Sequence, residues 1–314
     1  MSRPHRGEQT MLQIARLRYE DGLSQSEIAS EMGVSVATIS RHLKQAMELG
    51  IVEIRVAARA SRNFELERQL ARKFNLDSAI VVSSQKNKND TLALLGKTSG
   101  IALGEFLKDG AIVGVSNGET VAAVADNMRR SRASDINVVT LIGGVGRPEE
   151  PGQTGQICRS FASRIGGDAW VLPVPAVVES SKIAAAFRST KAHREVFSLV
   201  EKTTIALIGI GSTTPGSSTF QHGHFSSELL EDIVENNAVG TICARFFDIN
   251  GEVTPTDIDS RTISISLKQL AAVPVKFGVA IGNDKTRAIM AAIRGGLISV
   301  LGTDSAAAEA LLAD

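Results

Sequence analysis

The chain has 314 residues, which is long enough for more than one domain and for at least one sizeable hydrophobic core. Its 34 basic and 34 acidic residues balance, which excludes a protein that binds any polyanion through a broad positive field. The two cysteines lie far apart, no apolar run is long enough to cross a membrane and the N-terminus is too charged for a signal peptide, which predicts a soluble cytoplasmic protein without disulfides.

Residues 24–46 are typical of two helices joined by a tight turn, the unit that places a recognition helix in the major groove of DNA. They follow an amphipathic helix that ends near Gly22, because glycine commonly comes just after the last residue of a helix. Ser24 and Glu27 have the spacing of a capping box, which satisfies exposed backbone donors at a helix start. Gly33 lies where the turn needs a positive φ angle.

The second helix of this pair has the two faces that a recognition helix needs. Ser35 is placed to cap it, and its apolar residues recur at the spacing that points them inward: Ile39, Leu43 and Ala46. The outward side chains are small, polar or cationic, as a base-reading face requires. With Gln25, which we expect to contact a phosphate, the predicted DNA-binding residues are Gln25, Ser35, Ala37, Thr38, Ser40, Arg41 and Lys44. The alternative is an ordinary helical hairpin, but the caps, the turn glycine and the polar face all agree in register.

The charge of the N-terminal part bears on how DNA would be bound. Residues 1–62 hold nine basic and seven acidic side chains, a net charge of +2. Affinity for double-stranded operator DNA must then come from a few placed contacts and from a homodimer or homotetramer, because so small a charge gives little nonspecific attraction.

A change of pattern after the recognition helix predicts three segments. Residues 51–56 alternate as a strand would, which indicates a small wing at the end of the first domain. A small, basic stretch then reads as a hinge, and a helix that begins at Asn63 is predicted to pack on the larger domain and to contribute to a dimer contact. The predicted organisation is a DNA-binding domain, a hinge, and an effector-binding and oligomerisation domain, at residues 1–56, 57–62 and 63–314 respectively.

From residue 78 onward, short β-branched runs alternate with helical stretches, the pattern of a parallel sheet with helices on both faces. The predicted strands are residues 79–83, 111–116, 136–142, 169–174, 204–210, 239–246, 275–281 and 297–301. The predicted helices between and after them are residues 90–107, 120–130, 154–165, 191–200, 226–236, 285–294 and 305–312. The fold class is therefore α/β, with a helix-turn-helix domain in front of a parallel-sheet domain.

Four loops at the carboxyl ends of predicted strands combine glycines with polar groups: residues 115–120, 143–147, 209–214 and 282–285. Open parallel sheets bind ligands at these ends, and backbone N–H groups at helix starts favour anions. A single such loop indicates only a tight turn, but four at matching ends predict a binding site. Asp248 follows another strand, and its sequence leaves open whether it accepts sugar hydroxyls or caps its own turn. The predicted effector-binding residues are Ser116, Asn117, Gly118, Glu119, Thr120, Gly143, Gly144, Arg147, Gly211, Asp248 and Lys285.

Motifs for cofactors, metals and catalysis are missing from the sequence. No loop has the glycine spacing of a dinucleotide site, and neither a Walker sequence nor a nucleophile elbow occurs, so we expect no cofactor and no catalytic residue. His222 and His224 have no third ligand spaced near them, and we interpret them as surface histidines rather than a metal site.

Seven short motifs occur in order along nearly the whole chain, at residues 23–29, 50–54, 113–120, 143–144, 209–211, 247–251 and 285–289. Together they resemble the SorC-type transcriptional regulators, the family that includes the deoxyribonucleoside regulator of Bacillus-like bacteria. The resemblance implies an N-terminal DNA-binding domain and a C-terminal sugar-binding domain related in fold to ribose-phosphate isomerases and glucosamine-phosphate deaminases. It also implies dimers or tetramers, and effectors that are usually phosphorylated sugars.

Two departures from the family pattern bear on the effector. Many members have Trp where this chain has Asn117, and the position of Glu119 is often basic or neutral. A carboxylate beside a phosphate cradle repels a dianion unless Lys285 or Arg147 neutralises it. The sequence therefore leaves open an unphosphorylated sugar or polyol as well as a sugar phosphate.

These observations predict a sequence-specific transcriptional regulator of carbohydrate or polyol catabolism, controlled by a small sugar, polyol or sugar-phosphate effector. The alternative is an enzyme of the sugar-phosphate isomerase or deaminase class with an accessory helix-turn-helix. Such an enzyme needs a general base in its pocket, and only Glu119 and Asp248 are candidates. A third interpretation, a C-terminal domain that serves mainly for oligomerisation, would be excluded by stabilisation on ligand binding.

Overall fold

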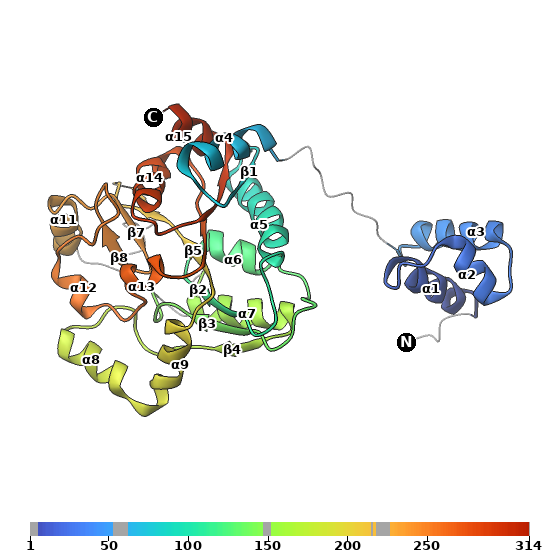
Figure 1. Cartoon of the computed structure of the whole chain (residues 1–314), viewed down its shortest axis with the longest axis horizontal. Helices are drawn as coiled ribbons and strands as arrows, with labels where there is room; N and C mark the ends of the chain where they lie inside the picture. The colour runs from blue at the N-terminus through green and yellow to red at the C-terminus, as the bar shows by residue number, and fades with distance from the viewer. Residues whose placement is uncertain (1–5, 53–61, 147–151, 215, 218–226, 314) are drawn as a thin grey trace. The chain divides into compact units, whose positions relative to one another are not determined.

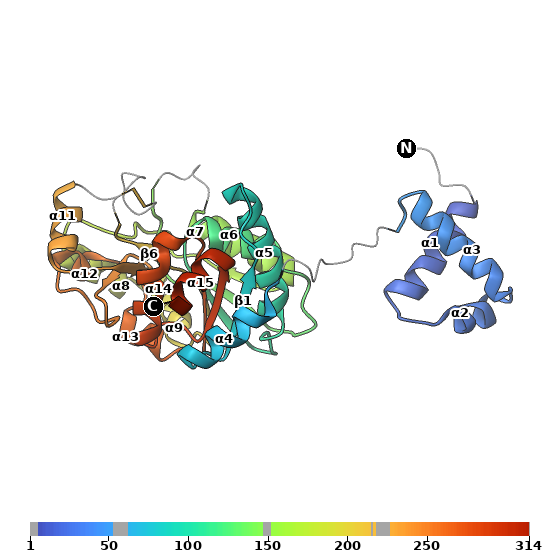
Figure 2. The same ribbon diagram turned by 90° about the horizontal axis from the view of Figure 1, so that it is seen from above.

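The computed structural model describes residues 6–52, 62–146, 152–214, 216–217 and 227–313 (Figure 1, Figure 2). The chain divides into two compact units, residues 1–59 and 60–314. The first unit has three described helices, α1 (Arg6–Tyr19), α2 (Gln25–Met32) and α3 (Val36–Glu48). Their apolar faces meet in one small core made of Ile14, Ile28, Ala29, Ile39 and Leu43.

Both α2 and α3 begin with the predicted caps, and the turn between them has the predicted glycine. Ser24 accepts a hydrogen bond from the Glu27 N–H at 3.2 Å, and the Glu27 carboxylate accepts one from the Ser24 N–H at 2.7 Å. Gly33 adopts φ 68°, in the left-handed region that glycine enters without strain. Ser35 caps α3 by accepting from the Thr38 N–H at 3.2 Å. These contacts confirm the helix-turn-helix that the sequence predicts.

A seven-stranded parallel sheet forms the centre of the second unit, with strand order β1-β10-β9-β5-β2-β3-β4. Its strands are β1 (Ser78–Val82), β2 (Ile112–Val115), β3 (Asn137–Thr140), β4 (Asp168–Trp170), β5 (Ile205–Gly209), β9 (Val275–Val279) and β10 (Val300–Asp304). From β2 the chain builds outward through β3 and β4, and β5 then returns to the opposite side of β2. The carboxyl ends of β2 and β5 therefore flank a topological switch point, where open α/β sheets bind ligands.

Two hydrophobic cores lie on the two faces of this sheet. One face is covered by α5 (Lys88–Gly104), α6 (Glu119–Ala125) and α7 (Thr154–Ile165), which lie side by side (Figure 1). The other core contains residues of α4 (Phe64–Phe74), α9 (Lys191–Glu201), α13 (Leu267–Ala271), α14 (Thr286–Arg294) and α15 (Ser305–Ala313). Helices on both faces are what the sequence pattern predicts.

One predicted strand, residues 239–246, is wrong as a member of the parallel sheet. These residues form an antiparallel hairpin of β7 (Gly240–Ile242) and β8 (Arg245–Phe247), which joins β6 (Gly211–Ser212) in a separate sheet. The two turn residues, Cys243 and Ala244, have φ 52° and 55°, the left-handed pair of a type I′ turn. Their sequence has none of the Asn-Gly or Asp-Gly character by which such turns are recognised.

The remaining described elements are α8 (Ser181–Ser189), α11 (Ser227–Glu235), α12 (Asp257–Arg261) and the short 3-10 helix η2 (Asn283–Lys285). Helices α11 and α12 share a small core with β8, α8 contacts α9 and α12, and η2 contacts β6. The sequence pattern did not predict α8, α12 or α13. The predicted wing and hinge fall largely on residues 53–61, and His222 and His224 also lie beyond the residues that the structure describes. In the described part of the chain, no helix is both long and apolar enough to span a membrane.

Candidate functional site

The outer face of α3 carries the side chains predicted to read bases. Ala37, Ser40, Arg41 and Lys44 are exposed, whereas Ile39, Leu43 and Ala46 of the same helix are buried. Their spacing of three, four and seven residues places these four on one face of the helix. Within the described residues, neither Arg41 nor Lys44 forms an ion pair, so both cations are available to an external acceptor.

The other predicted DNA-binding residues lie at helix starts. The hydroxyls of Ser35 and Thr38 are 2.9 Å apart at the N-terminus of α3. Gln25 is half-buried at the first position of α2. Polar groups at such N-termini are placed to contact phosphates, while the exposed side chains further along α3 can reach base edges.

The loops after β2 and β5 meet at the topological switch point. Buried Ser116 accepts a hydrogen bond from the Gly209 N–H at 3.0 Å and so joins the two loops. Gly118 opens α6 with φ 115°, and a Cβ added there would meet nothing within 4 Å. Gly209 packs against the Asn117 carbonyl and the Thr120 hydroxyl: a Cβ added at Gly209 would lie 3.3 and 3.6 Å from these two oxygens. Five predicted residues, Ser116 to Thr120, thus form one loop, and the Gly118 N–H in it donates to the Gly152 carbonyl at 2.9 Å.

Lys285 lies at the end of η2, just before α14 begins, and its side chain is only 13% exposed. Its ammonium nitrogen is 3.4 Å from the Asp284 carboxylate. Burial lowers the pKa of Lys285 from its ordinary value; Asp284 opposes this shift, and the nearby charge of Lys88 adds to it. Lys285 is therefore a poorly hydrated cation that would gain from contact with an anion or with several oxygen acceptors.

Lys88 pairs with Glu119 at the same edge of the sheet. It is not among the effector-binding residues predicted from the sequence. The Nζ–Oε2 distance is 3.6 Å, and the two side chains are 67% and 51% exposed. Such an exposed pair contributes only about 0–1 kcal/mol, so a ligand can displace it at little cost. Its position in the sequence could have indicated this role, because Lys88 begins the helix after β1 as Glu119 begins the helix after β2.

Gly143 and Gly144 are committed to packing. Their N–H groups donate to the carbonyls of Ile263 and Val174, at 3.0 and 2.8 Å. A Cβ at Gly143 would lie 2.5 Å from the Val174 carbonyl oxygen. Neither N–H is free to hold an anion, so close backbone approach accounts for these glycines, contrary to the expected ligand contact.

Asp248 is occupied by its own turn, the second of the two interpretations that its sequence allowed. Its carboxylate accepts hydrogen bonds from the N–H groups of Asn250 and Glu252 at 2.9 and 3.0 Å. In the same turn, Gly251 packs against Gly295, which follows the last residue of α14. Lys285 precedes the first residue of that helix, so the structure does not bring Asp248 to Lys285.

Of the remaining predicted residues, Gly211 lies in β6 opposite Thr241, directly after the β5 loop. Arg147 falls in the segment 147–151, outside the part that the structure describes. No group of three or more His, Cys, Asp or Glu side chains is placed to hold a metal ion in the described ranges.

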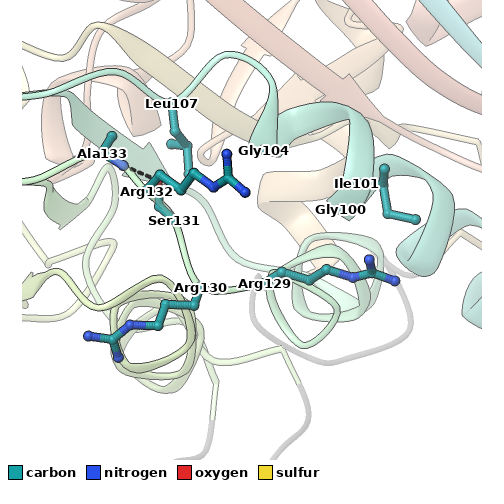
Figure 3. A pocket seen from close by; sticks show the side chains of 9 residues that line it. All are labelled: Gly100, Ile101, Gly104, Leu107, Arg129, Arg130, Ser131, Arg132 and Ala133. Carbon is teal, nitrogen blue, oxygen red and sulfur yellow. Dashed lines mark hydrogen bonds between the residues drawn. The ribbon is translucent and has the colours of Figure 1, made fainter. Parts of the chain in front are cut away.

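A hollow of about 280 Å³ lies at the opposite edge of the sheet, lined by Gly100, Ile101, Gly104, Leu107, Arg129, Arg130, Ser131, Arg132 and Ala133 (Figure 3). Three helices, α5, α6 and α7, end at this edge, and helix C-termini carry partial negative charge. The positive charges of the three arginines compensate this negative charge. The Arg130 guanidinium, for example, would lie 3.6 Å from a Cβ added at Gly166, the residue that caps the C-terminus of α7. An anion is favoured instead at the carboxyl edge, where α5, α6 and α14 begin.

Two family models match the chain. One, for a "Putative sugar-binding domain", matches residues 58–313. The other, for region 4 of sigma-70 factors, matches residues 16–49, which contain α2 and α3.

Similar proteins match over nearly the full length. The sorbitol operon regulator of Klebsiella pneumoniae is 31% identical over 305 residues, which are 96% of this chain and 97% of that protein. The deoxyribonucleoside regulator of Bacillus subtilis is 30% identical over 308 residues, 98% of each. The crystal structure of the full-length sorbitol operon regulator of K. pneumoniae matches with a TM-score of 0.81, covering 99% of this chain and 100% of that one at 30% identity.

Proposed function

This chain belongs to the SorC family of sugar-binding transcriptional regulators, and we propose that its two units divide operator recognition and effector binding between them. The protein is a sugar-responsive, DNA-binding transcriptional regulator, and its full-length relatives include the sorbitol operon regulator and the deoxyribonucleoside regulator. In this proposal α3 reads the operator, and the carboxyl edge of the parallel sheet binds a carbohydrate, polyol or sugar phosphate. The regulated genes would serve carbohydrate or polyol catabolism, in the cytoplasm.

The observation that carries the effector assignment is the placement of Lys285. This largely buried cation belongs to η2, which contacts β6 just after the β5 loop, and it lies near the charge of Lys88, which pairs with Glu119 at the start of α6. On the loop after β2, Thr120 adds a hydroxyl at the start of α6, whereas the Ser116 hydroxyl and the Gly118 N–H bond within the protein, to Gly209 and Gly152. Cations and free polar groups at helix starts suit a phosphate or the oxygens of a polyol.

The enzyme alternative draws less support from the two carboxylates that it requires. A general base must reach a proton of the bound sugar with a free carboxylate. Glu119 faces Lys88, and Asp248 accepts two hydrogen bonds within its own turn. No observation favours an isomerase or deaminase over a regulator, and we propose a function without catalysis.

A thermal-shift screen of the full chain against sugars, polyols and their phosphates tests the effector assignment. A ligand that binds only the folded state at about 100 times its Kd should stabilise it by about 2.7 kcal/mol and raise its Tm. The Lys285→Ala variant should lose that rise. No rise with any member of the three classes would favour the third interpretation, a C-terminal domain that serves mainly for oligomerisation.

We also expect the active form to be at least a homodimer that binds a pseudo-palindromic operator. The first 62 residues have a net charge of only +2, and one recognition helix gives few contacts. Two-fold symmetry doubles those contacts on two half-sites. Analytical ultracentrifugation and footprinting measure this; a monomer at working concentration that protects one unrepeated half-site would contradict it.

A further inference from the structure

Asp304, the last residue of β10, carries a buried carboxylate that joins two loops at the carboxyl edge. The residue as a whole is 4% exposed. Oδ1 accepts a hydrogen bond from the Gly282 N–H at 2.9 Å, and Oδ2 accepts one from the Ser84 hydroxyl at 2.7 Å. One oxygen therefore holds the loop after β9, and the other holds the loop after β1.

The partners of this carboxylate are neutral. Among the described residues, no Lys, Arg or His forms an ion pair with Asp304. Burying a carboxylate is costly unless hydrogen bonds satisfy it, and hydrogen bonds to an ionised acceptor are stronger than those between neutral groups. The two loops are thus held by stronger contacts than a serine or threonine at this position would give.

The first loop leads to Lys285. Gly282 has φ 96° and ψ 148°, a conformation open to glycine, and Gly118 at the start of α6 has nearly the same one. The Lys285 N–H donates to the Gly282 carbonyl at 3.1 Å. A fixed Gly282 N–H therefore fixes the turn that presents Lys285.

The second loop leads to Lys88. Ser84 donates its hydroxyl to Asp304, and its Oγ accepts from the Ala306 N–H at 2.9 Å. The Ser84 N–H donates to the Ser305 hydroxyl at 3.0 Å. These contacts attach the chain just before α5 to the start of α15, four residues ahead of Lys88.

We propose that Asp304 is a positioning residue of the effector site, which holds the loops of Lys88 and Lys285 in register without touching the effector. This inference rests on the proposed function of the carboxyl edge. In this inference Asp304, which lies outside the predicted ligand-contacting loops, sets the spacing between Lys88 and Lys285. That spacing in turn sets the affinity for a phosphorylated or polyhydroxylated ligand.

The test compares Asp304→Ala with Asp304→Asn in the full chain. Backbone amide exchange of residues 281–286 is one readout, and affinity for sorbitol 6-phosphate and for inorganic phosphate is the other. Asp304→Ala should speed exchange at Gly282 and weaken binding of the probes, each at least roughly tenfold, because the N–H loses its acceptor. Asp304→Asn should restore most of both, since its amide oxygen can accept from Gly282. Wild-type exchange and affinity in Asp304→Ala would overturn the proposal.

Two further variants keep the test decisive. Ser84→Ala removes the hydrogen bond that holds the loop after β1 to Asp304, and it can be measured even if Asp304→Ala does not fold. Amide exchange in residues 84–88 should rise and affinity for the probes should fall. No change in either quantity would count against the proposal. Asp109→Ala is the matched control, because Asp109 accepts from the N–H and hydroxyl of Ser134 in a loop outside the carboxyl edge. If neither probe binds the wild type, the proposed function fails for these ligands, while exchange at Gly282 still decides the role of Asp304.

Discussion

Replacing Arg41 with alanine is expected to weaken operator binding by about 1–3 kcal/mol and to relax the preference at one base pair. Arg41 is exposed on α3, and no described carboxylate pairs with it. Its guanidinium can therefore donate two parallel hydrogen bonds to a guanine, the commonest specific contact in the major groove. In a dimer the loss occurs once in each half-site, so the total effect on the complex would be larger.

Gln25→Ala should give a different result, because a phosphate contact carries no sequence information. Its loss should weaken the operator and unrelated DNA by similar factors. Fluorescence anisotropy on the operator and on single-base variants, all at one salt concentration, separates the two outcomes. Arg16→Ala serves as the control, since Arg16 is an exposed cation on α1 that faces Glu20 at 4.0 Å. Unchanged operator binding by a folded Arg41→Ala protein would remove Arg41 from the interface.

Local signals made the N-terminal unit predictable from its sequence. The capping box, the turn glycine and the inward spacing of apolar residues each depend on neighbours within four positions, and the structure has all three. The helix predicted at residues 154–165 has the observed bounds of α7 for the same reason: an apolar face ends at Gly166, which caps it in the left-handed conformation.

Contacts between distant residues account for what the sequence did not predict. The hairpin of β7 and β8 is predicted as one strand, because its turn residues, Cys243 and Ala244, are not among the Gly, Pro, Asn and Asp residues that mark turns. The sequence around Gly143 is typical of a ligand-binding loop, but the reason for the glycine is the Val174 carbonyl packed against it, which belongs to a distant part of the chain.

The candidate site shows the same limit. Lys88 and Asp304 are separated from the predicted ligand loops by many residues, and only the strand order brings the ends of β1, β10 and β9 together. Val82 lies opposite Asp304 in the register of β1 and β10, which places Ser84 within reach of that carboxylate. Strand order depends on how whole helices pack on the sheet, and no short motif records it.

Lys285→Ala is expected to reduce affinity for an anionic effector roughly 10- to 100-fold, the loss of one or more hydrogen bonds from a charged donor. The side chain is 13% exposed, so water cannot fully replace the lost contact. Operator binding without effector should be unchanged, because Lys285 belongs to residues 60–314 and α3 to the other unit. Titrating the operator complex with a sugar and with its phosphate measures both quantities.

Glu119→Gln decides which class of effector is bound. If the effector is phosphorylated, Lys285 pairs with the phosphate and Glu119 only repels it; Glu119→Gln then leaves the response intact or improves it, and Lys88 is released to help. If the effector is a neutral sugar or polyol, the Glu119 carboxylate accepts its hydroxyls, and the amide should weaken the response. Lys285→Ala and Glu119→Gln are both titrated with the same sugar and its phosphate, so that the two responses can be compared directly.

The pH dependence gives an independent check on the same choice. Burial lowers the pKa of Lys285, so its ammonium loses its proton at a lower pH than an ordinary lysine does. Affinity for a phosphorylated effector should therefore fall as the pH rises toward that lowered pKa, and Lys285→Arg, which stays charged, should remove this fall. Binding of a neutral sugar should change much less over the same range. A phosphate response that is full in Lys285→Ala and flat with pH would place the effector somewhere other than the carboxyl edge beside Lys285.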